Sequence, residues 1–296
     1  MNIFITGASG LVGTALSQKL TEKEYNVFKL GRKTSNSTNT SPDWDIGINQ
    51  DNSPIFANAY IHLAGENIAA KRWSDKQKKK IYESRILGTQ KLVQKIINSP
   101  NKPDTFICAS AIGYYGDRKQ ELLDETSLPG EDFVSKISHD WEQATQPLID
   151  CGIRVVNLRF GVILSKKGGA LKKMLTPFKL GLGGAIGSGQ QKFSWVSLDD
   201  AVNAIIYVIN KPGIEGPVNV TSPNPVSNKV YTKSLAKVLK RPAIFNMPAS
   251  VCRLMFGEMA DELLLSSQSV MPKKLIQNGF KFNHLKIDTA LSSTLK

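Results

Sequence analysis

Short apolar runs alternate with amphipathic runs along the first two thirds of the chain. The apolar runs lie at 2–8, 26–32, 59–65, 104–111 and 153–161 and are nearly uninterrupted, which is typical of parallel strands buried on both faces. Between them, apolar positions recur at helical spacing over 11–24, 74–97 and 132–150. This alternation predicts an α/β fold with a Rossmann-like, doubly wound parallel sheet.

The pattern changes after residue 165. Residues 166–192 are rich in glycine and are predicted not to form one regular element, but to wrap over a site. A further helix is predicted to begin at Ser197, and two short helical patterns follow from about Arg241. We therefore expect a Rossmann domain at 1–240, with a substrate-side insertion at about 165–192, and a small C-terminal lobe at 241–296.

Charge and composition restrict the classes of partner. The 296 residues include 38 Lys and Arg against 25 Asp and Glu, a net charge of +13. The densest basic run, AKRWSDKQKKK, is typical of a solvated helix face, and no basic run is interleaved with aromatic residues as in a single-strand nucleic-acid groove. We expect a small, anionic substrate and no nucleic-acid partner.

The chain shows no sign of membrane insertion or of disulfide bonding. No run approaches about 18 consecutive apolar residues, and the first residues resemble a strand and turn rather than a signal peptide. The three cysteines are isolated from one another, which favours reduced thiols and does not suggest a metal site. These features predict a cytoplasmic protein without a membrane partner, either a monomer or a homodimer.

A glycine-rich turn follows the first predicted strand directly. In TGASGLVG, Gly7, Gly10 and Gly13 stand three residues apart at the start of the first helix. Glycine allows a tight turn and close approach to a pyrophosphate, and the N-terminus of a helix offers free N–H groups and a partial positive charge. In this strand-turn-helix context the turn predicts a dinucleotide site.

The end of the second strand indicates which dinucleotide binds. An NAD site usually has Asp or Glu here, whereas this strand ends in LGRK, with Arg32 and Lys33 and no acid. An arginine can bind the 2′-phosphate of NADP through charge-assisted hydrogen bonds. NADP is therefore favoured over NAD, and a solvated basic turn is the alternative.

Motifs along the whole chain resemble those of a known superfamily. TGASGLVG, HLAGENIA, SAIGYYG, LRFGVIL, LGLGGAIGSG, SWVSLDD, TSPNPV and FGEMAD occur in order. Together they resemble the short-chain dehydrogenase/reductase superfamily, and within it the atypical branch of epimerase-family proteins. The resemblance implies a Rossmann fold that binds NADP(H) in a cleft.

The resemblance also implies site residues. It assigns the pyrophosphate to Gly7, Gly10, Leu11, Val12 and Gly13, and the adenosine ribose and its phosphate to Gly31 and Arg32. It assigns the adenine and ribose side to Leu63, Ala64 and Gly65, a cofactor contact to Arg85, and the nicotinamide side to Val162. For Leu63, Ala64 and Val162 the alternative is simple packing at the ends of strands.

The superfamily's usual proton-transfer pair is missing. The standard mechanism uses a tyrosine and, four residues later, a lysine that lowers the tyrosine pKa on the same helix face. The helix expected to carry them, EDFVSKISHDWEQA, has no tyrosine, and aligning its WE places Val134 at the tyrosine position and Ser138 at the lysine position. Lys136 is on this helix with the wrong spacing.

The strand CASA, by contrast, still presents a serine. Ser110 stands in the superfamily's serine context, and Tyr114 and Tyr115 are the nearest hydroxyl groups able to move a proton. These three are the catalytic candidates, with backbone bonding or packing as the alternative for each. We expect an NADP(H)-dependent oxidoreductase or epimerase acting on a small anionic substrate such as a nucleotide sugar. The alternative is an NADP(H)-binding sensor without turnover.

Overall fold

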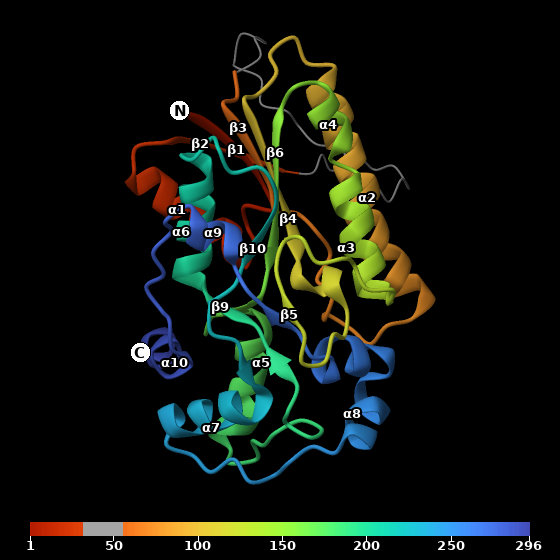
Figure 1. The fold of residues 1–296 in the computed structure, drawn as a ribbon, viewed down its shortest axis with the longest axis vertical. Helices are drawn as coiled ribbons and strands as arrows, with labels where there is room; N and C mark the ends of the chain where they lie inside the picture. The colour runs from red at the N-terminus through yellow and green to blue at the C-terminus, as the bar shows by residue number, and fades with distance from the viewer. Residues whose placement is uncertain (32–55) are drawn as a thin grey trace. The chain divides into compact units, whose positions relative to one another are not determined.

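The predicted alternation forms a six-stranded parallel sheet in the order β10-β6-β4-β3-β1-β2 (Figure 1). The computed structural model describes residues 1–31 and 56–296. The strands are β1 (Asn2–Thr6), β2 (Asn26–Leu30), β3 (Ala59–His62), β4 (Thr105–Ala111), β6 (Arg154–Phe160) and β10 (Gly216–Val220). The chain leaves β1 for β2 on one side and returns to β3 on the other, so the strand order reverses between β1 and β3, where ligands of such sheets bind.

The described residues divide into two compact units. Unit 1 comprises 1–110, 137–158 and 205–217, and unit 2 comprises 111–136, 159–204 and 218–296. The boundary between them falls inside β4, β6 and β10 and inside the helices α3 (Phe133–Gln143) and α6 (Leu198–Ile209). Residues 241–296 therefore share a unit with earlier segments, and the expected domain boundary near residue 240 stays a prediction.

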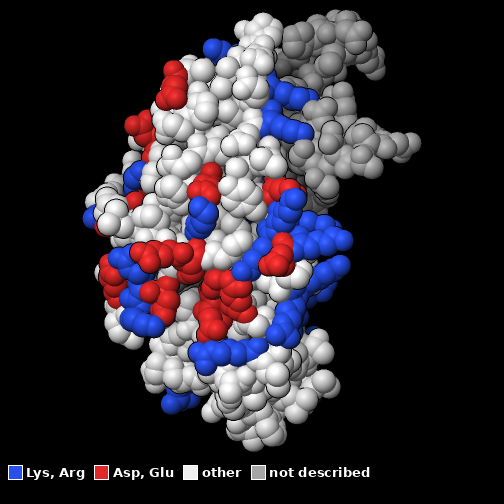
Figure 2. All heavy atoms as spheres, turned by 90° about the vertical axis from the view of Figure 1, so that its right-hand side faces the viewer, with Lys and Arg blue, Asp and Glu red and all other residues white. Residues whose placement is uncertain are grey.

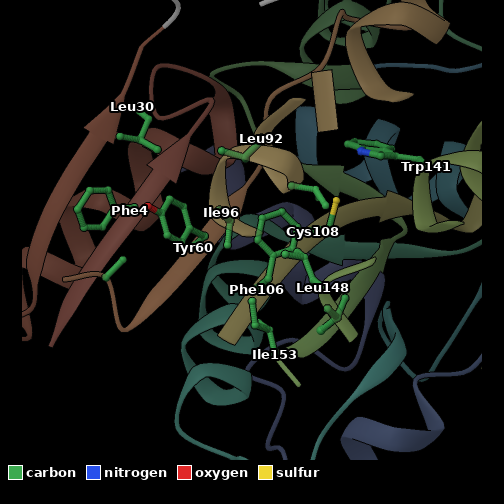
Figure 3. Packing of buried hydrophobic residues seen from close by; sticks show 13 residues of the cluster. Phe4, Leu30, Tyr60, Leu92, Ile96, Phe106, Cys108, Trp141, Leu148 and Ile153 are labelled. Carbon is green, nitrogen blue, oxygen red and sulfur yellow. The ribbon is translucent and has the colours of Figure 1, made fainter. Parts of the chain in front are cut away.

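Unit 1 is built around the sheet, parts of α3 and α6, and three whole helices. These helices are α1 (Leu11–Glu22), α2 (Asp75–Ile97) and α4 (Gln146–Asp150). Figure 3 shows the core, where Phe4, Tyr60 and Phe106 from neighbouring strands lie together with side chains of α2. Phe4 and Phe106 are fully buried, as the apolar strand pattern predicts for a sheet covered on both faces.

Unit 2 has its own core. Leu171 and Phe178 of α5 (Gly169–Lys179), Tyr231 of α7 (Asn228–Leu239) and Leu291 of α10 (Ile287–Leu295) are all buried in it, together with Trp195. The glycine-rich stretch 166–192 therefore contains a helix in its first half and is irregular in its second half, so it does not form one regular element, as predicted.

Short elements complete unit 2. They are a 3-10 helix at Ile112–Tyr115, β5 (Leu122–Leu123), β7 (Val162–Leu164), β8 (Lys192–Phe193), β9 (Trp195–Ser197), β11 (Val226–Ser227), α8 (Ala249–Phe256), a π-helix at Ala260–Leu265, β12 (Ser269–Val270) and α9 (Lys273–Gln277). β5 pairs with β12, β7 with β9, and β8 with β11.

The basic run lies on a surface of mixed charge. On the face drawn in Figure 2, Lys and Arg side chains lie beside Asp and Glu side chains. On α2, Lys79 Nζ lies 3.8 Å from Glu83 Oε1, one helical turn away. Lys76 and Lys80 of the same helix are exposed. This arrangement agrees with a solvated helix face.

Candidate functional site

A cavity of about 550 Å³ opens in unit 1 at the carboxyl ends of β1, β2 and β3. It lies at the reversal of strand order, where doubly wound sheets bind their ligands. Six of the predicted cofactor residues line it, namely Gly7, Gly10, Gly31, Leu63, Ala64 and Gly65. The remaining residues that line the cavity were not predicted from the sequence: they are Ala8, Ser9, Thr14, Lys29, Leu30, Glu66 and Ser84.

The glycine turn is shaped by steric limits. Gly7 has a φ of +69°, and a Cβ there would lie 2.7 Å from the Leu63 carbonyl carbon, so the turn packs directly on the chain after β3. A Cβ at Gly13 would lie 2.2 Å from the Gly7 oxygen, so this glycine allows α1 to pack against the turn. Both positions therefore require glycine.

Gly10 faces the cavity and begins α1. It is the N-cap of the helix, it forms no side-chain cap, and the first turn contains no acid. The first N–H groups of a helix have no partner within the helix, and the helix dipole makes this end partly positive. Leu11 and Val12 of this turn are half-buried and do not line the cavity, so any contact with a cofactor would come from their backbone. Their predicted role stays a prediction.

The end of β2 brings a positive charge to the cavity. Lys29 is exposed and lines it, next to Leu30 and Gly31. A Cβ at Gly31 would meet no atom within 4 Å, so this position has open space around it. From Asn26 to Gly31 there is no acid. Arg32, which carries the predicted preference for NADP, and Lys33 lie outside the described residues.

Arg85 supports the segment after β3 that lines the cavity. Its Nη1 donates to the carbonyl of Glu66 at 2.9 Å, and its guanidinium lies 5.0 Å from the ring centre of Trp141. Burial lowers the pKa of Arg85 to about 10, so the group is charged at neutral pH. The Ser84 hydroxyl accepts from the Glu66 N–H at 3.0 Å. In this structure Arg85 holds the segment after β3, and its predicted cofactor contact stays untested.

A buried histidine lies at the end of β3, directly before the cavity residue Leu63. His62 ends β3, has no exposed surface, and its Nδ1 lies 2.6 Å from the Thr6 hydroxyl at the end of β1. Its Nε2 lies 3.0 Å from the hydroxyl of Thr89, which also accepts from the Trp141 indole N–H at 2.8 Å. Burial lowers the pKa of His62 to about 3, so the ring is neutral. The network joins β1, β3, α2 and α3 below the cavity.

The serine of the CASA strand is engaged within unit 1. Ser110 is buried, and its hydroxyl donates to Glu142 Oε1 at 2.7 Å. Glu142 is the acid of the WE pair used to align the α3 sequence. This bond is consistent with either role of Ser110, because a substrate oxygen could replace the carboxylate or bond the same hydroxyl.

The two candidate tyrosines belong to unit 2 and differ in environment. Tyr115 is fully buried, donates to Asn219 Oδ1 at 2.7 Å and accepts from Arg159 Nη1 at 3.0 Å. Burial raises the pKa of Tyr115 to about 12. Tyr114 is half-buried, and the Arg159 guanidinium lies 3.4 Å from its ring centre. The surroundings of Tyr115 favour a structural role, so Tyr114 is the more accessible candidate.

The two residues at the positions of the usual tyrosine and lysine are buried. Val134 and Ser138 of α3 are 4% and 3% exposed, so neither side chain offers a group to solvent. Val162, the predicted nicotinamide neighbour, is half-buried and pairs with Trp195 in unit 2. In residues 1–31 and 56–296, no three His, Cys, Asp or Glu side chains are placed to hold a metal ion.

Comparison with known proteins shows the family of the chain. The NAD dependent epimerase/dehydratase family matches residues 3–221, which include the glycine turn and all of the main sheet except the first residue of β1. A domain of unknown function, DUF1731, matches 247–294. The chain belongs to the NAD dependent epimerase/dehydratase family. It is an atypical short-chain dehydrogenase/reductase of the epimerase-family proteins.

Individual relatives of this epimerase-family protein cover the whole chain. It is 38% identical to the epimerase family protein YfhF of Bacillus subtilis over 100% of this chain and 98% of that one. It is 38% identical to the epimerase family protein Mb2239 of Mycobacterium bovis over 98% and 96%. The crystal structure of the human epimerase family protein SDR39U1 with NADPH matches with a TM-score of 0.88 and 29% identity, over 99% of each chain.

The residues of this epimerase-family protein fit a dinucleotide. The cavity combines glycines that allow close backbone approach, an uncapped helix N-terminus and, among the described residues, one cationic side chain, which are features that suit phosphate groups. The family assignment shows an NAD(P)-binding chain.

No helix among the described residues is long and apolar enough to cross a membrane.

Proposed function

We propose that the protein is an NADP(H)-dependent oxidoreductase or epimerase that acts on a small anionic substrate such as a nucleotide sugar. The observation that carries the cofactor choice is the end of β2, where Lys29 lines the cavity and no acid stands from Asn26 to Gly31. An acid here would repel a 2′-phosphate, whereas a cation attracts it. The human relative crystallised with NADPH supports the same choice.

The cofactor would be held mainly by the backbone. The N–H groups around Gly10 would bind the pyrophosphate, and Lys29 with Arg32 would bind the 2′-phosphate. Leu63, Ala64 and Gly65 would form the wall on the adenosine side. When bound, the cofactor would supply the group that accepts or donates hydride.

The proton must come from a group other than the missing tyrosine. Ser110, Tyr114 and Tyr115 remain the candidates, and Tyr114 is the less buried of the two tyrosines. The Arg159 guanidinium stacks on the Tyr114 ring at 3.4 Å from its centre and so helps to hold this side chain in place. We propose Tyr114 as the proton-transfer group and Ser110 as a hydrogen-bond partner of the substrate oxygen.

One observation favours the alternative of a cofactor-binding sensor without turnover. The hydroxyls of Ser110 and Tyr115 are both hydrogen-bonded to other side chains, Glu142 and Asn219, and the usual catalytic positions hold Val134 and Ser138. Stopped-flow oxidation of bound NADPH against a panel of nucleotide sugars and other anionic metabolites separates the two. Turnover of any substrate supports the enzyme, and cofactor binding without turnover on the panel supports the sensor.

The cofactor choice has a separate test. Fluorescence titration is expected to show tighter binding of NADPH than of NADH, and Lys29→Ala or Arg32→Ala each to weaken NADPH selectively, by about 1 to 3 kcal/mol per lost charge-assisted bond. Lys23→Ala, an exposed lysine after α1, is the matched control and should change neither affinity. Equal wild-type affinities for NADH and NADPH would contradict the proposal.

A further inference from the structure

Four large apolar side chains are exposed where two irregular segments of unit 2 run side by side. Phe245 N donates to Gly183 O at 3.1 Å, and Ile186 pairs with Met247 as an isolated parallel bridge, so 180–187 and 242–247 are neighbours. The exposed members, which we call the apolar patch, are Leu180 (70%), Leu182 (57%), Ile244 (72%) and Phe245 (56%).

The exposed apolar surface continues along the chain into α8. Val251, Leu254 and Met255 have the i, i+3 and i+4 spacing of one helix face and are 41%, 76% and 53% exposed. Cys252, on another face of this helix, is fully buried. Single exposed apolar residues are common on soluble proteins, whereas a group of this kind marks an interaction surface.

The same part of unit 2 carries the excess charge of the chain. Residues 159–198 include seven Lys or Arg, residues 218–257 include six, and neither range includes an Asp or a Glu. These thirteen positive charges equal the net charge of +13 of the whole chain. The remaining residues are therefore balanced, and the imbalance belongs to the two ranges 159–198 and 218–257, which contain the segments of the apolar patch.

Basic side chains directly flank the apolar patch. Lys179 precedes Leu180, and Lys240 and Arg241 precede Ile244 by a few residues, and all three basic residues are exposed. Arg241 Nε donates to Lys179 O at 3.1 Å, which holds the two basic ends together. Exposed apolar side chains thus lie beside cations without an acid in either segment.

We propose that the apolar patch and its basic flank bind the surface of a lipid bilayer that contains anionic lipids, which departs from the expectation from sequence of no membrane partner. Apolar side chains enter the boundary between headgroups and acyl chains, and Lys and Arg near the surface are attracted to anionic headgroups. The apolar patch has both features: exposed apolar side chains and basic side chains beside them. The contact is interfacial, so the absence of a spanning helix among the described residues does not bear on it.

Two other occupants fit the patch less well. A second copy would bring Lys179, Lys240 and Arg241 of both chains to the same interface, where like charges repel. A nucleic acid would use the charges but not the exposed Leu, Ile, Val and Met, because base stacking requires aromatic rings and Phe245 is the single aromatic member of the exposed group.

Co-sedimentation of the full chain with vesicles tests the proposal. We expect binding to vesicles of phosphatidylcholine with about a third phosphatidylglycerol, and at least about tenfold weaker binding to pure phosphatidylcholine. The variant Ile244→Ser/Phe245→Ser, which keeps every charge, should weaken binding by at least about tenfold. The variant Lys240→Glu/Arg241→Glu should weaken it to a similar extent and make it insensitive to salt.

The control has the same change of net charge elsewhere. Lys76→Glu/Lys80→Glu alters two exposed lysines of α2 and should leave vesicle binding unchanged. Circular dichroism should show all three variants folded, since the altered side chains are exposed. The proposal is overturned if the wild type does not bind anionic vesicles, or if Lys76→Glu/Lys80→Glu loses binding as much as the patch variants do. It is also overturned if the protein binds RNA and only Lys240→Glu/Arg241→Glu abolishes that binding. A wild-type dimer that becomes a monomer in the patch variants would indicate an interface between two copies instead.

Discussion

The carboxylate of Glu262 accepts a hydrogen bond from the backbone N–H of Val134, with 2.9 Å between Oε2 and the nitrogen. Val134 stands where the superfamily's tyrosine is expected, so a carboxyl group of the C-terminal region reaches the start of α3. Burial, helped by Asp132 and Glu258, raises the pKa of Glu262 to about 7. The hydrogen bond from Val134 lowers the pKa of Glu262, but burial and the neighbouring acids raise it by more.

The raised pKa of Glu262 predicts a loss of stability at alkaline pH. The folded protein holds this proton more tightly than the unfolded chain, whose carboxyl titrates near 4.5, so the contribution is full below about 4.5 and is lost as the pH rises through about 7. Glu262→Gln should therefore raise the free energy of unfolding at pH 8.5 by roughly 1 kcal/mol and change it little at pH 5. Urea unfolding at both pH values measures this. An equal effect at both would contradict it, and Glu131→Gln, an exposed neighbour, is the control.

The glycine turn predicts different effects for two of its glycines. A Cβ at Gly10 would meet only the Gly7 oxygen, at 3.2 Å, so the side chain of Gly10→Val should extend into the cavity. The variant should fold and should bind NADPH about 100-fold more weakly or worse. Gly13→Ala should instead destabilise the fold by about 1 to 3 kcal/mol, because its Cβ would lie 2.2 Å from the Gly7 oxygen. Thermal unfolding and titration with NADPH measure both effects. Unchanged affinity in folded Gly10→Val would remove the turn as the phosphate site.

The buried His62 predicts a loss of stability in mild acid. Burial holds its folded pKa near 3, below the unfolded value of 6.5, so the unfolded chain binds the extra proton as the pH falls below about 6.5. Between pH 8 and pH 5 this costs about 2 kcal/mol. His62→Gln removes the titration, so the stability difference between wild type and variant should shrink by that amount at pH 5. Urea unfolding of both proteins at the two pH values measures it, and a constant difference would show that His62 does not titrate on unfolding.

The environments of the two tyrosines predict opposite phenotypes. Tyr115→Phe should lower the free energy of unfolding by about 1 to 3 kcal/mol, because it leaves buried Arg159 and Asn219 without a partner hydroxyl. Tyr114→Phe should leave stability nearly unchanged and lower turnover by about 100-fold. The measurements are thermal unfolding and single-turnover hydride transfer with any substrate found. Ser110→Ala should lower turnover with little change in NADPH affinity, and wild-type rates in Tyr114→Phe and Ser110→Ala together would assign the strand and its following loop a structural role.

Local pattern was sufficient to predict the sheet and the phosphate turn. Buried parallel strands must be apolar on both faces, so the runs that contain Phe4 and Phe106 stand out in the sequence, and Gly7, Gly10 and Gly13 follow the first strand directly. These elements could be linked to function because they follow one another directly in the sequence. The end of the first strand, the turn and the start of the next helix line one side of the cavity. Sequence spacing also showed that α3 lacks the tyrosine and the lysine.

Tertiary structure decided everything that depends on residues distant in the chain. Lys29 and Glu66 line one cavity although 37 positions separate them, and nothing in either local sequence distinguishes them from other charged residues. The burial of Tyr115 against Asn219 and the bond from Val134 to Glu262 likewise join segments more than 100 residues apart. Local sequence determines secondary structure and turns because their hydrogen bonds are local. Burial and pKa depend on which distant side chains pack around a group, and this is decided only when the chain folds.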